Sequence, residues 1–346
     1  MGPTKRRLVD AVEGHPSPHR HVHAITAAME TRDVLLCIFS FQGGVHIDMR
    51  PLAGLQLPLH VQVDLVLGLY DGLTSSLARV HASLSTWTDV HGTSRLSPLL
   101  RCLPRLWDVL VLDAIVHGNE RTVAWLVAHQ LDKLTSFWVP LLDIAAHCGH
   151  LSLLRLLHGT PAGHCTSAAM HAAAVHGDLP IVQFLHAHRR EGCKAHTLLF
   201  AARKGRADVV RFLCSHRLGG SVVDASVAAA RAGHIPVVAA LLPELQRQPV
   251  VDLMEEAADA GQLRMVEWLC RQGFPTDGAR VAAVASGHIA IVEALWEPAV
   301  HDHMIAMATR HVQKHVMRWL QRKARETASD EINVTRNNNI QLLSLV

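Results

Sequence analysis

Histidine and cysteine are the residues of this sequence that most readily suggest a chemical function. The 346 residues include 26 histidines and seven cysteines, and both side chains bind metal ions and act as catalytic groups. Their spacing argues against either use, because the sequence contains no CxxC or HExxH pair and no GxSxG or GxxxxGK loop. His301 and His303 stand two positions apart, so on a helix they point in different directions. We therefore predict no catalytic residues, no metal site and no cofactor.

The cysteines and the N-terminal residues indicate the compartment. An odd number of widely spaced cysteines is typical of reduced thiols in an intracellular protein. The basic start, Lys5 to Arg7, is followed by Asp10 and Glu13, which interrupt the apolar core that a secretory signal needs. A net charge of +3 gives no general attraction to nucleic acid or membranes. We predict an intracellular protein, in the cytoplasm or, as an alternative, in the nucleus.

Several histidines belong to a repeat rather than to a site. His117 and His176 stand directly before a glycine, and His150, His234 and His288 stand directly after one. These glycines recur at intervals of 31, 28, 28, 28, 28 and 26 residues, at Gly118, Gly149, Gly177, Gly205, Gly233, Gly261 and Gly287. A column that recurs in this way is expected to serve the fold.

Each repeat has the pattern of two short helices. Alanine stands four positions before every one of these glycines, and leucine stands eight positions after. Small alanines let a helix approach its neighbours, and glycine ends the helix because it takes a left-handed backbone without penalty. The polar residue after the glycine is expected to cap the second helix, at Asn119, His150, Asp178, His234, Gln262 and His288. One such pair cannot bury its own apolar face, so the pairs are expected to stack.

The segment "PLLDIAAHCGHLSLLRLL", residues 140–157, resembles the ankyrin-repeat pattern TPLHxAAxxGHxxVVxxLL, and the likeness extends over about residues 105–297. The resemblance implies an all-α fold, an α-solenoid of stacked antiparallel helix pairs. The family's period is about 33 residues, whereas the period here is mostly 28, which predicts stunted or absent β-turn fingers. The TPLH tetrad is eroded, and only His171 stands at its histidine position. The alternative is an α-solenoid of another type.

The flanks of the array follow other patterns. Residues 1–30 are expected to form a mobile polar arm, 31–104 an irregular helical region, 105–325 the array with a capping helix over 304–325, and 326–346 a disordered tail. Within the second range, "DVLLCIFSFQ" (33–42) weakly resembles the first helix of an F-box, which would make the protein a substrate adaptor of a ubiquitin ligase. The alternative is a helix that caps the array. The basic face of the C-terminal helix suggests nucleic-acid or anionic-lipid binding as a second alternative function.

The variable positions of the repeat are the candidates for binding. In ankyrin-like stacks the first helix and the finger build a concave surface, and the positions one and two before each glycine are expected to face it. From these positions we select His147, His176, Arg203, Lys204, Arg231 and Asp259. The cations among them predict a protein partner with an acidic segment. We expect a non-catalytic, monomeric interaction scaffold that binds neither nucleic acid nor membranes.

Overall fold

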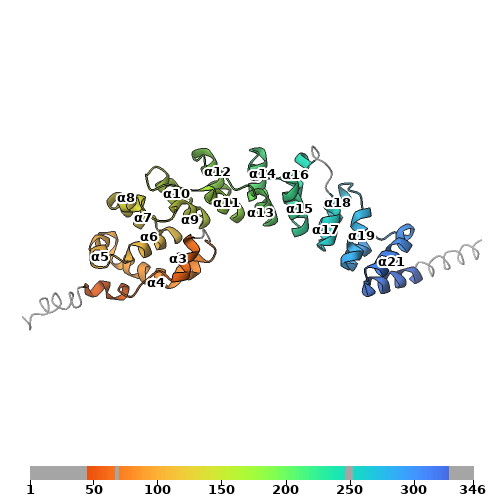
Figure 1. Ribbon diagram of the computed structural model, residues 1–346, viewed down its shortest axis with the longest axis horizontal. Helices are drawn as coiled ribbons and strands as arrows, with labels where there is room; N and C mark the ends of the chain where they lie inside the picture. The colour runs from red at the N-terminus through yellow and green to blue at the C-terminus, as the bar shows by residue number, and fades with distance from the viewer. Residues whose placement is uncertain (1–44, 67–69, 246–251, 327–346) are drawn as a thin grey trace, which may run out of the picture. The chain divides into compact units, whose positions relative to one another are not determined.

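A computed structural model describes residues 45–66, 70–245 and 252–326. In these ranges all regular secondary structure is helical and no strand is present (Figure 1). The chain divides into two compact units, one ending at Leu134 and one beginning at Thr135. The arm over 1–30, the F-box-like segment 33–42 and the tail from 327 onward lie outside the described residues.

The N-terminal unit is built around one long helix, α4 (Leu73–His91). Its buried residues, Leu73, Leu77, Val80, Leu84 and Trp87, follow steps of three and four and form a single apolar stripe. Helix α6 (Leu106–Val116) packs against α4, and nine of its residues are buried. The unit also contains η2 (Ile47–Leu52), α3 (Leu59–Val66), η3 (Thr93–Arg95), α5 (Leu96–Cys102), α7 (Glu120–His129) and most of α8 (Leu131–Thr135). The first clear repeat, α6 with α7, therefore packs with the irregular region that precedes it.

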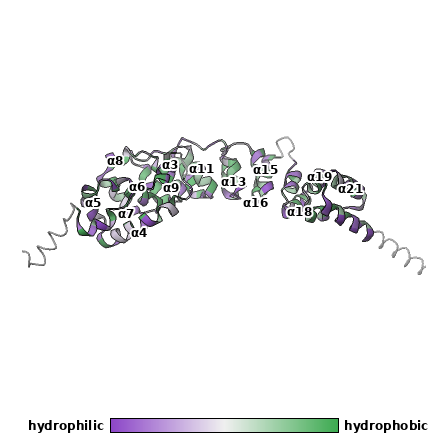
Figure 2. Cartoon of the chain, turned by 60° about the horizontal axis from the view of Figure 1, so that its bottom comes forward, coloured by the Kyte–Doolittle hydropathy of each residue, from purple (hydrophilic) through white to green (hydrophobic). Residues whose placement is uncertain are grey.

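The C-terminal unit is a series of helix pairs, as the all-α solenoid prediction requires. First helices pack on first helices and second helices on second helices (Figure 1). The pairs are α9 (Leu141–His147) with α10 (Leu151–His158), α11 (Ser167–His176) with α12 (Leu179–His188), α13 (Thr197–Arg203) with α14 (Ala207–Ser215), α15 (Val222–Ala232) with α16 (Ile235–Leu245), α17 (Leu253–Asp259) with α18 (Leu263–Arg271), and α19 (Asp277–Ser286) with α20 (Ile289–Ala294). The loops over 159–166, 189–196, 216–221 and 272–276 are short and contain no strand, which confirms the stunted fingers. Figure 2 shows hydrophobic residues along α11 and α13, as expected for helices packed between neighbours.

The repeat columns have the burial that their spacing predicts. The alanines four before the glycines and the leucines eight after them are at most 5 % exposed in all seven copies. Every one of the seven glycines has a φ between 71° and 94°, which is left-handed. In each copy the backbone N–H of the next residue donates to the carbonyl of that alanine, at 2.8–3.0 Å. This is the C-terminal hydrogen bond of a Schellman motif, and it closes the first helix of every repeat.

The residue after the glycine has a role that the sequence pattern did not predict. The capping prediction is confirmed at Asn119, whose side chain accepts from the N–H of Thr122. It is wrong for His150, Asp178, Gln262 and His288, which make no side-chain cap bond. In three repeats the side chain after the glycine instead bonds to a backbone carbonyl of the preceding repeat, at the residue two positions before that repeat's glycine. The pairs are His234 with Arg203, Gln262 with Arg231, and His288 with Asp259, each at 3.0 Å. Arg206 makes the same bridge to Val175 at 3.2 Å.

The bridging side chains are a second reason why glycine is required at these positions. A Cβ atom built at Gly205 would lie 2.9 Å from the imidazole of His234, and one at Gly233 would lie 2.5 Å from the side-chain oxygen of Gln262. The left-handed turn and the bridging side chain therefore both require a residue without a side chain at this position.

The C-terminal end contains one more helix pair than the glycines indicate. Helix α21 (His301–Arg310) packs on α19, and a second helix covers 314–326. The predicted capping helix over 304–325 is wrong, because the chain turns between the two helices at 311–313. Val312 occupies the glycine position with a φ of 56°, and the backbone N–H of Gln313 donates to the carbonyl of Ala308 at 2.9 Å. Val312 is 70 % exposed, whereas Val316 and Leu320 of the following helix are buried.

The strained turn at Val312 leads to a stability prediction. A β-branched residue in the left-handed region costs about 1–2 kcal/mol, and glycine removes most of that cost. After allowance for the greater freedom of glycine in the unfolded chain, we expect Val312→Gly to raise the free energy of unfolding by about 1 kcal/mol, measured by urea denaturation. The matched control is Val90→Gly on α4, also exposed but at a helical φ, which should lower it by about 0.5–1 kcal/mol. Equal effects from the two substitutions would show that the turn is unstrained.

Candidate functional site

The predicted binding residues lie at the ends of consecutive first helices, but their surroundings differ. His147 ends α9 and His176 ends α11, and their rings meet edge to face with centroids 4.5 Å apart. His176 is exposed and His147 is partly covered. The two histidines thus form a neighbouring pair, as their common register predicts.

Arg203 ends α13, Lys204 is the capping residue that follows it, and both are exposed. The guanidinium of Arg203 lies over the ring of Phe200, 4.5 Å from its centroid. Its backbone carbonyl is bound by His234 from the next repeat. Among the described residues, neither Arg203 nor Lys204 forms an ion pair with a carboxylate. Arg203 is therefore held by its contacts, and both cations are exposed without a carboxylate partner among the described residues.

Arg231 has the equivalent position one repeat later, but its charge is already satisfied. Its Nη1 lies 2.7 Å from a carboxylate oxygen of Glu256 and 3.3 Å from one of Asp259. The hydrogen bond and the charge of Glu256 raise the pKa of the Arg231 guanidinium above its ordinary value. Ser286 donates to Asp259 at 2.6 Å. Arg231 and Asp259 thus belong to one network that connects α15, α17 and α19, and the predicted cationic surface ends at Lys204.

A second group of titratable residues lies between α11 and α13. Nδ1 of His171 lies 3.0 Å from the hydroxyl of Thr197, which is fully buried. Burial, followed by the nearby charges of Lys194 and His196, lowers the pKa of His171 from 6.5 to about 4. His171 is therefore a neutral hydrogen-bonding residue at physiological pH, and it ties two successive repeats together.

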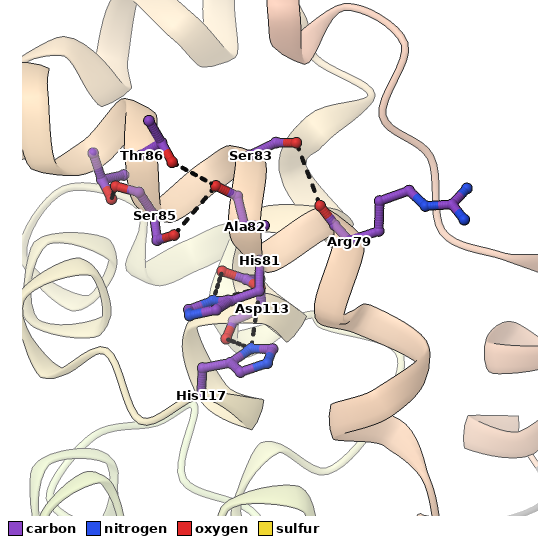
Figure 3. A network of polar contacts seen from close by, with 9 residues as sticks. Arg79, His81, Ala82, Ser83, Ser85, Thr86, Asp113 and His117 are labelled. Carbon is purple, nitrogen blue, oxygen red and sulfur yellow. Dashed lines mark hydrogen bonds and ion pairs between the residues drawn. The ribbon is translucent and has the colours of Figure 1, made fainter.

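The described residues also contain a histidine–aspartate–histidine network that the sequence pattern missed. Asp113 on α6 is buried, and its carboxylate oxygens lie 3.2 and 3.3 Å from Nδ1 of His81 on α4 (Figure 3). Nδ1 of His117, one turn further along α6, lies 3.1 Å from the same carboxylate. The repeat register identifies His117 but not its partner, because α4 lies outside that register. Burial raises the pKa of Asp113, although both imidazoles oppose this effect.

The geometry of this network fits hydrogen bonding better than metal binding. The rings of His81 and His117 stack with centroids 3.7 Å apart and planes 15° apart. A metal ion must lie close to the plane of each imidazole that binds it. Two nearly parallel rings at this separation cannot both direct an Nδ1 lone pair at one ion, whereas two N–H groups can both donate to one carboxylate. The network therefore fastens α4 to α6.

Three of the cysteines, Cys148, Cys165 and Cys214, are equally unsuited to nucleophilic chemistry. Burial raises the pKa of Cys148 and of Cys214 to about 11. The pKa of Cys165 rises to about 12, again mainly through burial. A thiol with such a pKa is protonated at neutral pH and is a poor nucleophile. These cysteines act as packed apolar side chains.

The basic row predicted on the C-terminal helix is interrupted. Lys314, Arg318 and Arg322 are exposed on the helix over 314–326, but Arg310 ends the preceding helix, α21. The turn at 311–313 therefore separates Arg310 from the other three cations. In the described ranges, no helix combines the length and the apolar character that crossing a bilayer requires.

Comparison with known proteins assigns the repeats. A family model described as ankyrin repeats (3 copies) matches residues 141–226, and one described as ankyrin repeats (many copies) matches residues 111–158. No curated protein matches the sequence. The resemblance inferred from the repeat pattern is thus confirmed over residues 111–226.

The network at Asp113 leads to a second stability prediction. Asp113→Asn keeps the size of the side chain but replaces the anionic acceptor that serves two imidazoles, and it places a second donor against them. We expect the free energy of unfolding to fall by about 1–3 kcal/mol in chemical denaturation. The control is Asp89→Asn, an exposed carboxylate near the end of the same α4, which should change it by less than about 0.5 kcal/mol. If Asp113→Asn left the denaturation midpoint unchanged, the network would not stabilise the packing of α4 on α6.

The pKa of His171 leads to a pH prediction. Between pH 6.5 and about 4 the unfolded chain holds a proton on His171 that the folded chain does not. Acidification through this window therefore favours unfolding, and the stability contributed by neutral His171 is lost as the pH falls. We expect His171→Asn to reduce the loss of stability between pH 7 and pH 5. Titration of the His171 imidazole by NMR should show a midpoint near 4; a midpoint at 6.5 would contradict the buried, neutral state.

Proposed function

We propose that this chain, whose residues 111–226 are ankyrin repeats, is a non-catalytic scaffold that binds an acidic segment of another protein through Arg203 and Lys204. Ankyrin repeats generally mediate protein–protein interaction. The observation that carries the proposal is the contrast between α13 and α15: the cations that end α13 have no carboxylate partner among the described residues, whereas Arg231 is paired with two.

The position of Arg203 supports its role in recognition. Contact with Phe200 holds the guanidinium, and the bridge from His234 holds the backbone beside it. A cation that is ordered before binding loses less side-chain entropy when a carboxylate arrives. A guanidinium also offers donors in a planar fork that matches a carboxylate.

The alternatives have less support. The ubiquitin-ligase adaptor rests on residues 33–42, which lie outside the described residues, so it stays a prediction. Nucleic-acid or lipid binding rests on a basic row that the turn at 311–313 shortens. The acidic-segment proposal is therefore the one that the described residues favour.

A charge-reversal experiment tests the proposal. The probe is a fluorescein-labelled peptide of 12 residues that alternates Asp and Glu with Ser and Gly, and binding is followed by fluorescence anisotropy at low and at high salt. We expect Arg203→Glu with Lys204→Glu to weaken binding by about tenfold or more, because each change removes an attractive contact and adds a repulsive one. Both residues are exposed, so the melting temperature should stay nearly constant.

The matched control has the same change in net charge. Arg155→Glu with Arg211→Glu alters exposed cations on the second helices α10 and α14. This variant should retain affinity within about twofold if the first-helix face is the binding surface. Equal losses of affinity in both double variants would show that only the net charge of the protein matters, and this would overturn the proposal.

A further inference from the structure

Phe200 and the three side chains around it form a compact group that we term the aromatic–cationic cluster: His171, His196, Phe200 and Arg203. The ring of Phe200 meets His196 at 5.3 Å and His171 at 5.7 Å, in edge-to-face arrangements. The two imidazoles are 5.1 Å apart. Lys194 lies in the loop over 189–196, and its charge adds to burial in lowering the pKa of His171. The cluster thus joins α11, the loop over 189–196 and α13 on the first-helix side of the repeats.

Phe200 is the feature that sets this repeat apart. The residues five positions before the seven glycines are Asp113, Ile144, Ala172, Phe200, Ala228, Glu256 and Ala282. Phe200 is the aromatic residue of this column. It is partly exposed rather than buried, so core packing does not account for its size. Its ring instead lies beneath Arg203, with the Cζ atom of the guanidinium 4.5 Å from the ring centroid, a cation–π contact.

The guanidinium of Arg203 offers two kinds of binding surface. One face lies over Phe200, and the exposed position of Arg203 leaves the opposite face and the N–H edge toward solvent. The edge matches a carboxylate, and the outer face matches a second aromatic ring. His196, within the cluster, and Lys194, in the adjoining loop, add donors for a negatively charged chain.

We propose that the aromatic–cationic cluster recognises an aromatic side chain flanked by carboxylates in the partner's acidic segment. This inference rests on the proposed function and makes it more specific. The aromatic side chain stacks on the outer face of the Arg203 guanidinium, while the carboxylates bond to its edge and to Lys194 and Lys204. Acidic residues supply the attraction, and the aromatic residue selects among acidic segments.

Three peptides separate the two contributions. The first has a central Trp between Asp and Glu residues, the second has Leu in place of Trp, and the third keeps Trp but has Asn and Gln in place of the acids. We expect the first peptide to bind about two- to fivefold more tightly than the second, as one stacking contact at an exposed site implies. The third should bind at least about tenfold more weakly than the first.

Two variants test whether the preference for the Trp peptide depends on Phe200 and Arg203. Phe200→Leu removes the ring beneath the guanidinium, and Arg203→Lys keeps the charge but removes the planar group. Both should abolish the preference for Trp over Leu and retain binding to the acidic peptides. The control is Phe212→Leu on the second helix α14, which removes an aromatic ring from the same repeat and should keep the preference. Arg203→Lys is conservative and exposed, so it tests the inference even if Phe200→Leu lowers the stability.

The outcomes distinguish the inference from the function on which it rests. Equal affinity of the wild type for the Trp and Leu peptides overturns the inference and leaves acidic binding intact. Tight binding of the third peptide overturns both the inference and the proposed function, because the charge would then play no part. A failure of both acidic peptides to bind overturns the proposed function and the inference together.

Discussion

The left-handed turn between the two helices of each repeat is the constraint on which the array depends. At this point the chain must reverse direction within a few residues, keep the carbonyl of the first-helix alanine hydrogen-bonded, and leave room for a side chain from the next repeat. Glycine satisfies all three demands, as at Gly205, where the φ is 78° and the imidazole of His234 occupies the space a Cβ would need. The buried alanines and leucines on either side keep their register because this turn recurs.

Features that depend on neighbouring residues in one repeat could be predicted from the sequence, and features that depend on the approach of another helix could not. The helix pairs, the buried columns and the short loops follow from local spacing, and the structure contains them. The role of His288 follows from where the preceding repeat places the carbonyl of Asp259, so a local capping rule assigned it wrongly. The last helix pair was missed for a related reason: Val312 adopts the glycine conformation without being glycine.

The candidate site shows the same division. Its register was predictable, because Arg203 and Arg231 stand at the same place in successive repeats. Which of the two guanidinium groups has a carboxylate partner within the chain was not predictable, because Glu256, which pairs with Arg231, lies 25 residues further along the sequence. The network at Asp113 was also hidden, since His81 lies on a helix outside the repeat. Long-range pairing of polar groups, rather than the position of each residue, decides which variable side chains stay open.

The bridges between repeats have a consequence for how such an array changes over time. Each one ends on a main-chain carbonyl, a group that every amino acid possesses, at the position whose side chain is a candidate for recognition. The bond itself sets no requirement on the side chain at that position, although the side chains of Arg231 and Asp259 also form ion pairs of their own. A duplicated or exchanged repeat can be joined to any neighbour by the same bond. The bonds that join successive repeats through these carbonyls therefore do not depend on the side chains that a partner would contact.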